Sequence, residues 1–501
     1  MIFIMNKVAQ LSAFCLFISP LFTEPAFGTV KYQSNPNTNT VLTIHEDGNT
    51  IARGNSATGG LLTNYGTVDL KHNIDNQTGT FSDLGAGDFI FSGTTSQTIS
   101  GPVTFQNLTL NNPDGVTTVS DIQVNGVFTL TNGRLTLGGS NLLLGNAASI
   151  AGTPSASAMV VATGTGELRR SFPVSPSFPF AFTFPVGDVD GTAEYSPVTV
   201  NFTSGTFGSG NYLGVSLKNE ADPFPGIATG NYLNRYWILN SDGITGSISC
   251  DLTFKFTDAD VSGVKSNLYC IKTSPALFEY DNYLSNNVLN GTVSTFSRFT
   301  GADQLVKTNL KLFLEGLYNP ATGQMNKAQD FDGGGYFDKY EGTIADVINV
   351  ELHDGLNFQT IAYSFPDLEL QQNGTLTFNL PKSYMGSYYT VLKHRNHIET
   401  VSMSPVSYNP GMVSYDFSTA AGQAFGNNQK QVSTGIWGFF TGDVNQDGIV
   451  NLIDLSSENS AVLNLEKGYL STDLNGDGIV NLIDLSTVNS ATLNLVTRKT
   501  P

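Results

Sequence analysis

The sequence predicts a mainly β protein of several modules that ends in a small α-helical module built on a duplicated loop. Short apolar runs alternate with polar residues at a period of two, which is typical of β-strands. Only 13% of the 501 residues are charged, while glycine, threonine, asparagine and serine are abundant, as in chains of short strands and tight turns. A chain of this length is expected to divide into domains of roughly 100–200 residues.

Residues 1–28 read as a secretory signal peptide. Lys7 precedes an apolar run over residues 8–22, and Ala26 and Gly28 supply the small residues that a signal peptidase needs. The run is too short for a membrane span and is interrupted by Pro20. We therefore expect a secreted or cell-surface protein without a membrane span.

The formal net charge of −18 argues against some classes of partner. DNA, RNA and anionic lipid would all repel such a chain, so binding to nucleic acid is not expected. The same charge is compatible with the collection of divalent cations.

Residues 29–170 form a ladder of short alternating runs separated by glycine and asparagine, for example residues 103–105, 122–124 and 142–144. Strands this short at near-regular spacing favour a β-solenoid, in which each rung buries its apolar face on the next. A β-sandwich of ordinary hairpins is the alternative.

Residues 171–302 contain longer strand-like runs, including 196–202, 235–239 and 250–256, and predict an antiparallel β-sandwich. Cys250 and Cys270 lie in two such runs and form either a disulfide or two buried thiols. Residues 184–188, 235–237 and 296–299 together resemble modules of large surface proteins of Bacteroidetes, Chlorobi and Ignavibacteria. That resemblance implies no assigned chemistry.

Residues 306–440 predict a smaller β-sandwich, with strands at 310–314, 376–380 and 388–393. The run 388–400, followed by residues 415–418, resembles a small sandwich module that often precedes dockerin-like ends in the same bacterial groups. The resemblance implies a spacer or adhesive domain and no active site.

Residues 441–501 contain a twelve-residue loop that occurs twice, thirty residues apart. The segments 443–465 and 473–495 differ at five of 23 positions, which leaves 18 identities. Calcium takes six to eight oxygen ligands, and such a loop supplies them from positions 1, 3, 5, 7, 9 and 12. Those positions hold Asp443, Asn445, Asp447, Ile449, Asn451 and Asp454 in the first loop, and Asp473, Asn475, Asp477, Ile479, Asn481 and Asp484 in the second.

Gly448 and Gly478 occupy the sixth position, where the chain turns with a positive φ. The two isoleucines would offer their backbone carbonyls. The pattern therefore predicts two calcium ions. A solvated Asp/Asn/Gly turn is the competing interpretation of one such loop, and the near-perfect duplication argues against it.

Two features distinguish these loops from helix–loop–helix EF-hands: position 12 is aspartate, and residues 436–440 before the first loop predict a strand. A loop followed by one short helix, twice, resembles a type I dockerin. We expect helices over 455–463 and 485–493, with Leu455, Leu463, Leu485 and Leu493 facing inward, and a module that folds only with calcium.

The dockerin resemblance also implies a partner-binding face. Loop positions 10 and 11, which help to contact a cohesin in that family, are Leu452 and Ile453 in the first copy and Leu482 and Ile483 in the second. An identical apolar pair in both halves implies a near two-fold symmetric face; packing between the helices is the alternative. Residues 456–459 and 486–489 lack the Lys/Arg-Tyr-Leu features of cohesin-binding members.

Three weaker patterns contain residue types that carry chemistry. Asp330 to Asp338 surround a glycine run that is expected to be a turn, with another calcium site as the alternative. His394 and His397 lie three apart, so a shared metal would need a turn between them. Asp188 and Glu194 are carboxylates of the kind that a glycosidase pairs, although nothing in the sequence marks them.

Together these patterns predict a secreted, non-catalytic surface or scaffold-associated protein whose C-terminal module binds two calcium ions and docks to a cohesin-like partner. The alternative is a component of extracellular polysaccharide catabolism, either a hydrolase of O-glycosyl bonds or a carbohydrate-binding protein of a cellulosome-like assembly. Only two tryptophans, Trp237 and Trp437, are present for a glycan cleft, and no serine or cysteine lies in a nucleophile-elbow context.

Overall fold

The computed structural model describes residues 30–33, 41–44, 50–53, 60–62, 67–78, 81–83, 85–283, 285–409 and 411–501. The chain divides into two compact units, each of which is described by itself: one comprises the chain up to residue 222 with 231–274 and 280–301, and the other comprises 223–230, 275–279 and 302–501. The predicted signal peptide, residues 1–28, lies outside the described residues. Among the described residues, no helix is long and apolar enough to cross a membrane.

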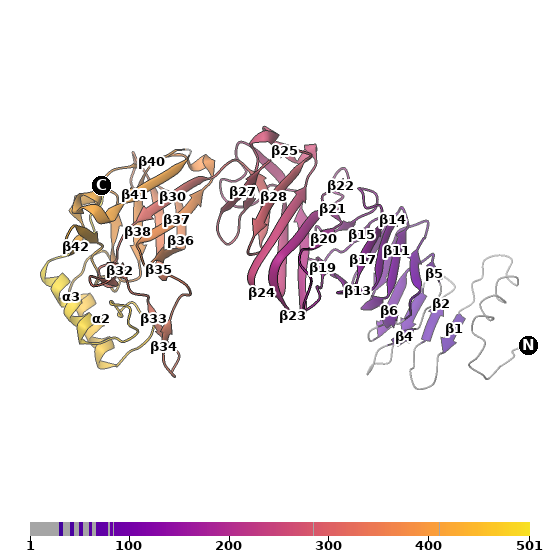
Figure 1. Ribbon diagram of the computed structural model, residues 1–501, viewed down its shortest axis with the longest axis horizontal. Coiled ribbons are helices and arrows are strands. Elements are labelled where there is room, and N and C mark those ends of the chain that lie inside the picture. The colour runs from indigo at the N-terminus through magenta and orange to yellow at the C-terminus, as the bar shows by residue number, and fades with distance from the viewer. Residues whose placement is uncertain are drawn as a thin grey trace, which may run out of the picture. The chain divides into compact units, whose positions relative to one another are not determined.

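The prediction of a mainly β protein is confirmed, and the N-terminal region is solenoid-like. Three sheets of short, mostly parallel strands run side by side along it, and Figure 1 shows these strands stacked in layers. The first sheet has the order β1 (Val30–Gln33), β2 (Val41–Ile44), β3 (Thr50–Arg53), β6 (Ile74–Thr78), β9 (Gln97–Ser100), β12 (Val116–Thr118), β15 (Leu135–Thr136), β18 (Val160–Val161), β21 (Val186–Asp188), β22 (Glu194–Tyr195). A second sheet has the order β5 (Thr67–Leu70), β8 (Asp88–Phe91), β11 (Asn107–Asn111), β14 (Val127–Asn132), β17 (Ser149–Gly152).

The third solenoid sheet continues into the antiparallel part of the first unit. Its solenoid strands are β4 (Gly60–Leu62), β7 (Phe81–Asp83), β10 (Val103–Phe105), β13 (Ile122–Val124), β16 (Leu142–Leu144) and β19 (Leu168–Arg170). Its antiparallel strands are β23 (Val198–Lys218), β24 (Tyr232–Lys255), β29 (Arg298–Ala302), β26 (Tyr269–Lys272) and β27 (Phe278–Asn282), with β20 (Phe180–Phe184), β25 (Val261–Ser262) and β28 (Val288–Val293) at their sides.

Period-two alternation explains the solenoid. Val103, Ile122, Leu142 and Leu168 occupy equivalent positions in successive parallel strands and are all buried. Each buried side chain of this size stabilises the fold by roughly 1.5–3 kcal/mol, so the stack is held by its apolar ladder as well as by backbone hydrogen bonds. The solenoid interpretation of this region is therefore preferred to a sandwich of hairpins.

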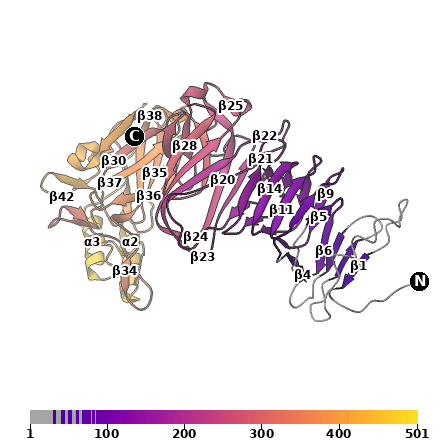
Figure 2. The same cartoon turned by 45° about the vertical axis from the view of Figure 1, so that its right-hand side comes forward.

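The long hairpin β23–β24 ends the parallel stack. Strand β19 pairs with β23 in the antiparallel sense, with Leu168 opposite Val215, and one apolar core runs from Leu70 to Phe299. Figure 2 shows the two long strands next to the solenoid layers. One sheet and one core thus continue past residue 170, where the sequence analysis places a domain boundary.

Cys250 and Cys270 are both buried free thiols, so of the two interpretations the structure has the thiols and not the disulfide. Cys250 lies in β24 and Cys270 in β26. Burial raises the pKa of the Cys250 thiol to about 12, which keeps it protonated and unreactive at neutral pH.

Asp188 and Glu194 do not form a catalytic pair. Both bind the fully buried guanidinium of Arg235, which also contacts Asp260; the Arg235–Asp188 and Arg235–Asp260 contacts measure 2.6 and 2.8 Å. One arginine on β24 therefore gathers three carboxylates that are distant in the sequence, and the cluster is structural.

The second unit is built on a sandwich-like sheet of eight strands with its own apolar core. The order is β39 (His397–Val401), β38 (Gly386–His394), β35 (Ile344–Asp354), β36 (Ile361–Gln371), β37 (Thr375–Leu380), β30 (Val306–Lys311), β41 (Met412–Asp416), with β40 (Val406–Tyr408) on β38. Three small hairpins are β31–β32 (Tyr318–Asn319, Gln324–Met325), β33–β34 (Gln329–Phe331, Tyr336–Asp338) and β42–β43 (Lys430–Ser433, Ile436–Gly438). Short 3₁₀ turns occupy Lys382–Tyr384, Phe417–Thr419, Ala421–Gln423 and Phe425–Asn427 in this unit, and Asp258–Asp260 and Lys265–Asn267 in the first.

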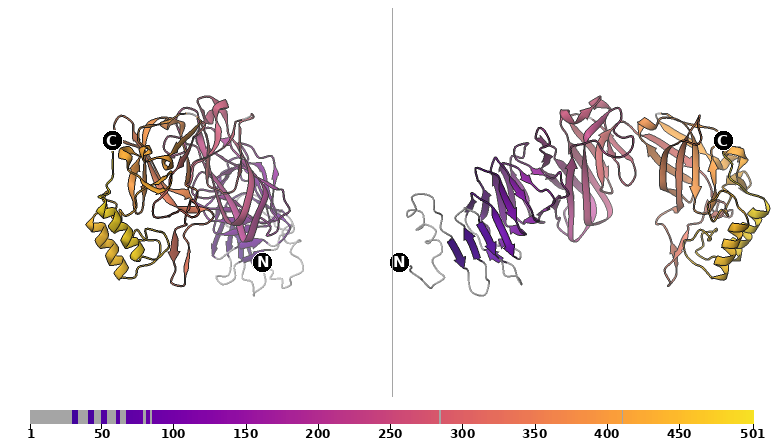
Figure 3. Two further views of the ribbon diagram at one scale, coloured as in Figure 1. Left: turned by 60° about the vertical axis from the view of Figure 1, so that its left-hand side comes forward. Right: turned by 180° about the vertical axis from the view of Figure 1, so that it is seen from behind.

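The chain ends in two helices, α2 (Leu452–Leu463) and α3 (Leu482–Leu493), which lie side by side in the second unit (Figure 3). Both begin three residues earlier than predicted, because Asn451 and Asn481 act as N-caps and Asp454 and Asp484 complete capping boxes.

The expectation that Leu463 and Leu493 face inward is wrong, since they are 73% and 76% exposed. The inward residues of α2 are Asp454, Glu458 and Ala461, which recur at i, i+4 and i+7. Leu463 follows Ala461 by two residues and therefore points about 200° away. Leu455 and Leu485 are partly buried.

We expect Arg235→Ala to lower the free energy of unfolding of the first unit by about 3–5 kcal/mol, because it leaves three carboxylates without their buried counter-charge. Urea unfolding followed by Trp237 fluorescence in a Trp437→Phe background measures this. Lys71→Ala, which removes an exposed ion pair with Asp69, is the control and should cost about 1 kcal/mol or less. Equal effects of the two substitutions would contradict the structural role of Arg235.

Candidate calcium loops and an apolar docking face

Both predicted loops are closed by the same side-chain hydrogen bonds to backbone. In the first loop, Asp443 Oδ2 accepts the N–H of Gly448 at 3.1 Å, and Asp447 Oδ1 accepts the N–H of Ile449 at 2.9 Å. The second loop repeats these contacts at the same distances with its own position-1 and position-5 aspartates. Gly448 has a φ of 87°, in the left-handed region that glycine adopts without strain. The loops therefore hold their ligand-position side chains in matched geometries.

The carboxylates at position 12 face the loop backbone. Asp454 Oδ1 accepts the N–H groups of Val444 and Asn445 at 2.9 and 3.2 Å, and its Oδ2 accepts that of Asn451 at 2.9 Å. Asp484 makes the equivalent contacts. Consistent with this, no group of three or more His, Cys, Asp or Glu side chains in the described part of the chain is arranged as a metal site.

Asn451 and Asn481 at position 9 are engaged locally. Each side-chain oxygen caps the following helix at 2.7 Å, and each amide nitrogen donates to the position-7 carbonyl of Ile449 or Ile479. Positions 1, 3 and 5 are thus grouped at one end of each loop, whereas positions 9 and 12 are used to start the helix.

Burial makes the position-1 aspartates weaker acids than usual. Asp443 and Asp473 are 2% and 0% exposed. Burial, with the negative charges of Asp454 and Asp447 nearby, raises the pKa of Asp443 to about 6. Burial raises the pKa of Asp473 to about 7, against the opposing effect of Arg395. A buried carboxylate is stable only with a partner that carries positive charge or donates hydrogen bonds.

The donor set fits a hard divalent cation. Oδ1 of Asp473 is buried and has no hydrogen-bond partner among the described residues, so one oxygen of the second loop is available. All predicted ligands are oxygens, from carboxylates, amides and backbone carbonyls, which is the ligand class of calcium. If bound there, the ion would supply the positive charge that the buried carboxylates lack.

Each loop pairs with the chain that follows the other helix. Val450 N–H donates to the carbonyl of Val496 at 2.9 Å, and Arg498 N–H to that of Gly448 at 2.7 Å. In the other half, Val480 N–H donates to Glu466 at 3.1 Å. This crossed pairing joins the two repeats into one pseudo-symmetric body.

A turn of the sandwich sheet, residues 394–397 between β38 and β39, contacts both loops; the sequence analysis missed this role. The backbone carbonyl of Asn396 accepts the N–H of Gly442 at 2.9 Å, and its side-chain amide donates to the carbonyl of Asp473 at 2.9 Å. Arg395 donates to the same Asp473 carbonyl at 2.9 Å. The only sequence signal was the polar run at residues 394–397 between two apolar strands.

The two histidines of this turn are structural. His394 and His397 are buried, with their Nδ1 atoms 2.9 Å apart, and His397 Nε2 accepts the N–H of Gly316 at 3.3 Å. Burial, together with the positive charges of His394 and Arg395, lowers the pKa of His397 well below its usual 6.5.

The weak calcium candidate near Asp330 is neutralised by lysines. Lys339 binds Asp330 at 2.6 Å and Lys327 binds Asp338 at 2.5 Å. Asp330 Oδ1 also accepts the N–H of Tyr469 at 3.1 Å, which ties this hairpin to the segment between the two repeats. The loop is a turn in which Asp330 and Asp338 are each paired with a lysine.

The predicted partner-binding residues are exposed in both repeats to the same degree. Leu452 and Leu482 are 71% and 70% exposed, and Ile453 and Ile483 are 59% and 60% exposed. Between the helices lies a groove of about 590 Å³ that equivalent residues of both repeats line: Leu452, Leu455, Ser456, Asn459, Leu482, Leu485, Ser486 and Asn489. The exposed leucine and isoleucine of each repeat therefore form an apolar, two-fold related face and do not pack the helices together.

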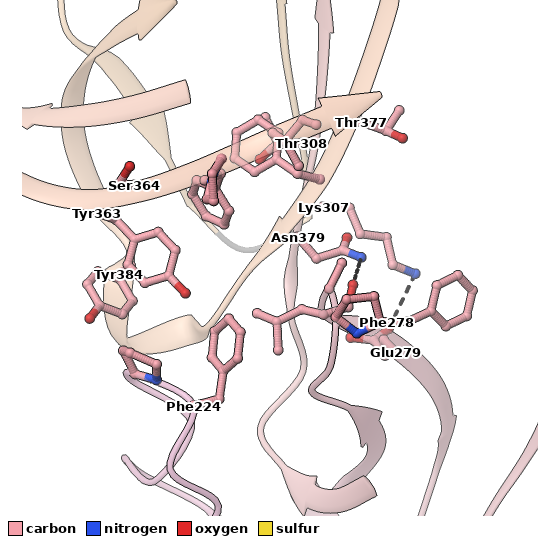
Figure 4. Close-up of a pocket in the computed structure, with 18 of the residues that line it drawn as sticks. Phe224, Phe278, Glu279, Lys307, Thr308, Tyr363, Ser364, Thr377, Asn379 and Tyr384 are labelled. Atoms are coloured by element: carbon pink, nitrogen blue, oxygen red, sulfur yellow. Dashed lines mark hydrogen bonds and ion pairs between the residues drawn. The ribbon is translucent and has the colours of Figure 1, made fainter. Parts of the chain in front are cut away.

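The second unit also contains a cavity of about 1020 Å³ with an aromatic wall and a polar end (Figure 4). The rings of Tyr363 and Tyr384 lie 4.4 Å apart on one side, and at the other Lys307 pairs with Glu279 at 3.3 Å. Glu279 is the one carboxylate among the lining residues.

No protein-family model and no curated protein matches the chain. Solved structures with partial similarity include two interface mutants of the type II cohesin–X-dockerin complex of Acetivibrio cellulolyticus. The C-terminal interface mutant is 16% identical, with a TM-score of 0.23, over 37% of this chain and 95% of that chain. The N-terminal interface mutant is 15% identical, with a TM-score of 0.22, over 38% and 97%. TM-scores of this size do not establish a shared fold.

We expect the stability of the second unit to depend on the protonation of His397. Below pH 6.5 the unfolded chain binds a proton that the folded His397 does not, so this contribution to stability is present above pH 6.5 and is lost as the pH falls. The difference in free energy of unfolding between the wild type and His397→Gln should shrink by about 1 kcal/mol from pH 6.5 to 5.5. Urea unfolding at pH 7.5, 6.5 and 5.5 measures it; a difference independent of pH would contradict the assignment.

Proposed function

We propose that residues 441–501 form a dockerin-like module that binds two calcium ions and docks a cohesin-like protein. The chain before it is proposed to be a non-catalytic, secreted array of solenoid and sandwich modules. The observation that carries the proposal is the duplication itself: two matched loops with buried acidic side chains lead into two helices that present the same apolar pair to solvent.

In this proposal calcium has a structural role. Asp443, Asn445 and Asp447 would hold one ion with the carbonyl of Ile449, and the second loop would use its equivalents. Positions 9 and 12 would complete each site, by Asn451 and Asp454 in the first loop and by Asn481 and Asp484 in the second. Their side chains would give up hydrogen bonds that they now make to backbone and bind the ion instead. Bound cations would relieve the repulsion among the buried carboxylates and stabilise the face that the loops and helices share.

Docking is supported by the exposure and symmetry of the apolar face. Four large aliphatic side chains at 59–71% exposure are costly on a soluble surface unless a partner covers them. The two-fold relation between the repeats would let a cohesin-like partner bind in either of two orientations, with Leu452 and Ile453 central in one and Leu482 and Ile483 central in the other.

Glycoside hydrolysis is less well supported. That chemistry generally needs two carboxyl groups that flank the scissile bond. The large cavity is lined by one, Glu279, which is paired with Lys307, and Asp188 and Glu194 are bound to Arg235. The polysaccharide alternative thus has a cavity but no acid–base pair within it.

Removing one position-5 aspartate should remove one calcium site. We expect calorimetric titration of the chelated full-length chain to give two ions for the wild type, one each for Asp447→Ala and Asp477→Ala, and none for the double variant. Calcium at 100 times its dissociation constant should add about 2.7 kcal/mol per site to the free energy of unfolding. Asp114→Ala, in an exposed solenoid turn, is the control and should keep both ions. A wild type without calcium binding would contradict the proposal.

The docking face can be tested with purified cohesin domains in calcium by surface plasmon resonance. Leu452→Asp or Leu482→Asp alone should leave one orientation usable and weaken binding only a few-fold, whereas the double variant should weaken it by at least about 100-fold. Leu356→Asp alters a fully exposed leucine elsewhere in the second unit and should have no effect. Unchanged binding by the double variant, or no binding of any cohesin by the wild type, would overturn the docking proposal.

A further inference from the structure

We propose that the two loops are unequal calcium sites, with the second loop the stronger, and that Glu458 causes the difference. This inference rests on the proposed calcium function of the loops. It concerns which residue sets the affinity of each site, a role that falls to a helix side chain outside both loops.

The two repeats differ in charge at a single position. Five positions differ between residues 443–465 and 473–495, and only one of them changes the charge: Glu458 in α2 corresponds to Val488 in α3. The other four differences exchange one uncharged residue for another. If the sites differ electrostatically because of the repeats themselves, Glu458 is the one residue that can make them differ.

Glu458 lies in a buried, acidic environment. Its side chain is on the inward face of α2 and is 0% exposed, and neither carboxylate oxygen has a hydrogen-bond partner among the described residues. The negative charges of Asp484 and Asp473, at positions 12 and 1 of the second loop, act on it. A buried carboxylate without a partner costs several kcal/mol unless positive charge lies nearby.

The equivalent residue of the other repeat has an apolar environment. Val488 on α3 packs over the start of the first loop, where its Cα lies 3.7 Å from the position that a Cβ on Gly442 would occupy, and it joins an apolar cluster with Val450. The first loop therefore has an apolar neighbour where the second has a carboxylate.

The nearby arginines do not cancel this difference. Arg395 lies at the second loop, where it donates to the Asp473 carbonyl, and Arg498 lies against Gly448 of the first loop. Each loop thus has one guanidinium beside it, and each guanidinium pairs with a carboxylate at 3.3 Å, Arg395 with Asp346 and Arg498 with Glu399, so the arginines do not offset Glu458.

Two further differences between the loops also favour calcium binding by the second loop. Asp443 Oδ1 accepts the N–H of Asp447 at 3.1 Å, whereas Asp473 Oδ1 has no partner and is available to a cation. At loop position 4 the backbone has a positive φ in both copies, and this conformation is strained for Gln446 but not for Gly476.

The experiment measures each site alone in the full-length chain. Asp447→Ala leaves only the second loop, and Asp477→Ala leaves only the first; calorimetry with calcium chloride gives the affinity of the remaining site. We expect the second loop to bind at least about tenfold more tightly. Adding Glu458→Gln, which keeps the shape and removes the charge, should weaken the second loop toward the first and leave the first unchanged.

A second readout is the melting temperature of the calcium-free chain. Glu458→Val places the residue of the other repeat at this position, so the melting temperature of the calcium-free chain should rise while the affinity of the second loop falls. Equal affinities of the two loops, or a Glu458→Gln effect on both or neither, would overturn the inference while leaving two calcium sites. Absence of calcium binding in every variant would instead overturn the proposed function itself.

Discussion

Hydrogen bonds from the turn at residues 395–396 connect the sandwich sheet of the second unit to both copies of the loop. The carbonyl of Asn396 accepts the N–H before the first loop, and its amide donates to the first residue of the second loop. The two loops also pair crosswise with the chain after each other's helix, so this turn and the hairpin at Asp330 together hold the pseudo-symmetric body against the sheet. The loops are thus part of the packed second unit, and their geometry depends on the sheet as well as on their own sequence.

That arrangement concentrates carboxylates where water cannot reach them. Asp443, Asp454, Asp473, Asp484 and Glu458 are all buried, and the pKa values of Asp443, Asp473, Asp484 and Glu458 are raised mainly by burial. Buried negative charge of this density opposes folding unless protons or cations compensate it. The outer faces of the same helices carry exposed leucine and isoleucine. An acidic interior beneath exposed apolar side chains is consistent with the proposed module, in which bound cations stabilise the fold and a partner covers those side chains.

In the first unit, the end of the parallel stack is covered by a long hairpin. A parallel stack of three-residue strands has an open end, and an unpaired strand edge invites association with other chains. Strand β23 closes the third sheet by pairing with β19 in the antiparallel sense, and the apolar core continues without interruption into the hairpin. The buried Arg235 on β24 of the same hairpin binds carboxylates of β21, β22 and the Asp258–Asp260 turn. These contacts join the parallel stack and the long hairpin in one core.

The sequence by itself determined the local features: the alternation that makes the solenoid strands, the strand before the first loop, and the residue types at each position of the duplicated loop. These follow from periodicity and spacing over a few residues, which the chain order states directly. The starts of the two helices were also set locally, by the capping boxes Asn451–Asp454 and Asn481–Asp484. The tertiary structure alone decided that Leu463 and Leu493 face solvent, that Asp188 and Glu194 share Arg235, and that Glu458 lies beside the second loop and Asn396 between the two. Each depends on contacts between segments distant in sequence, and register and packing set those contacts where local pattern cannot.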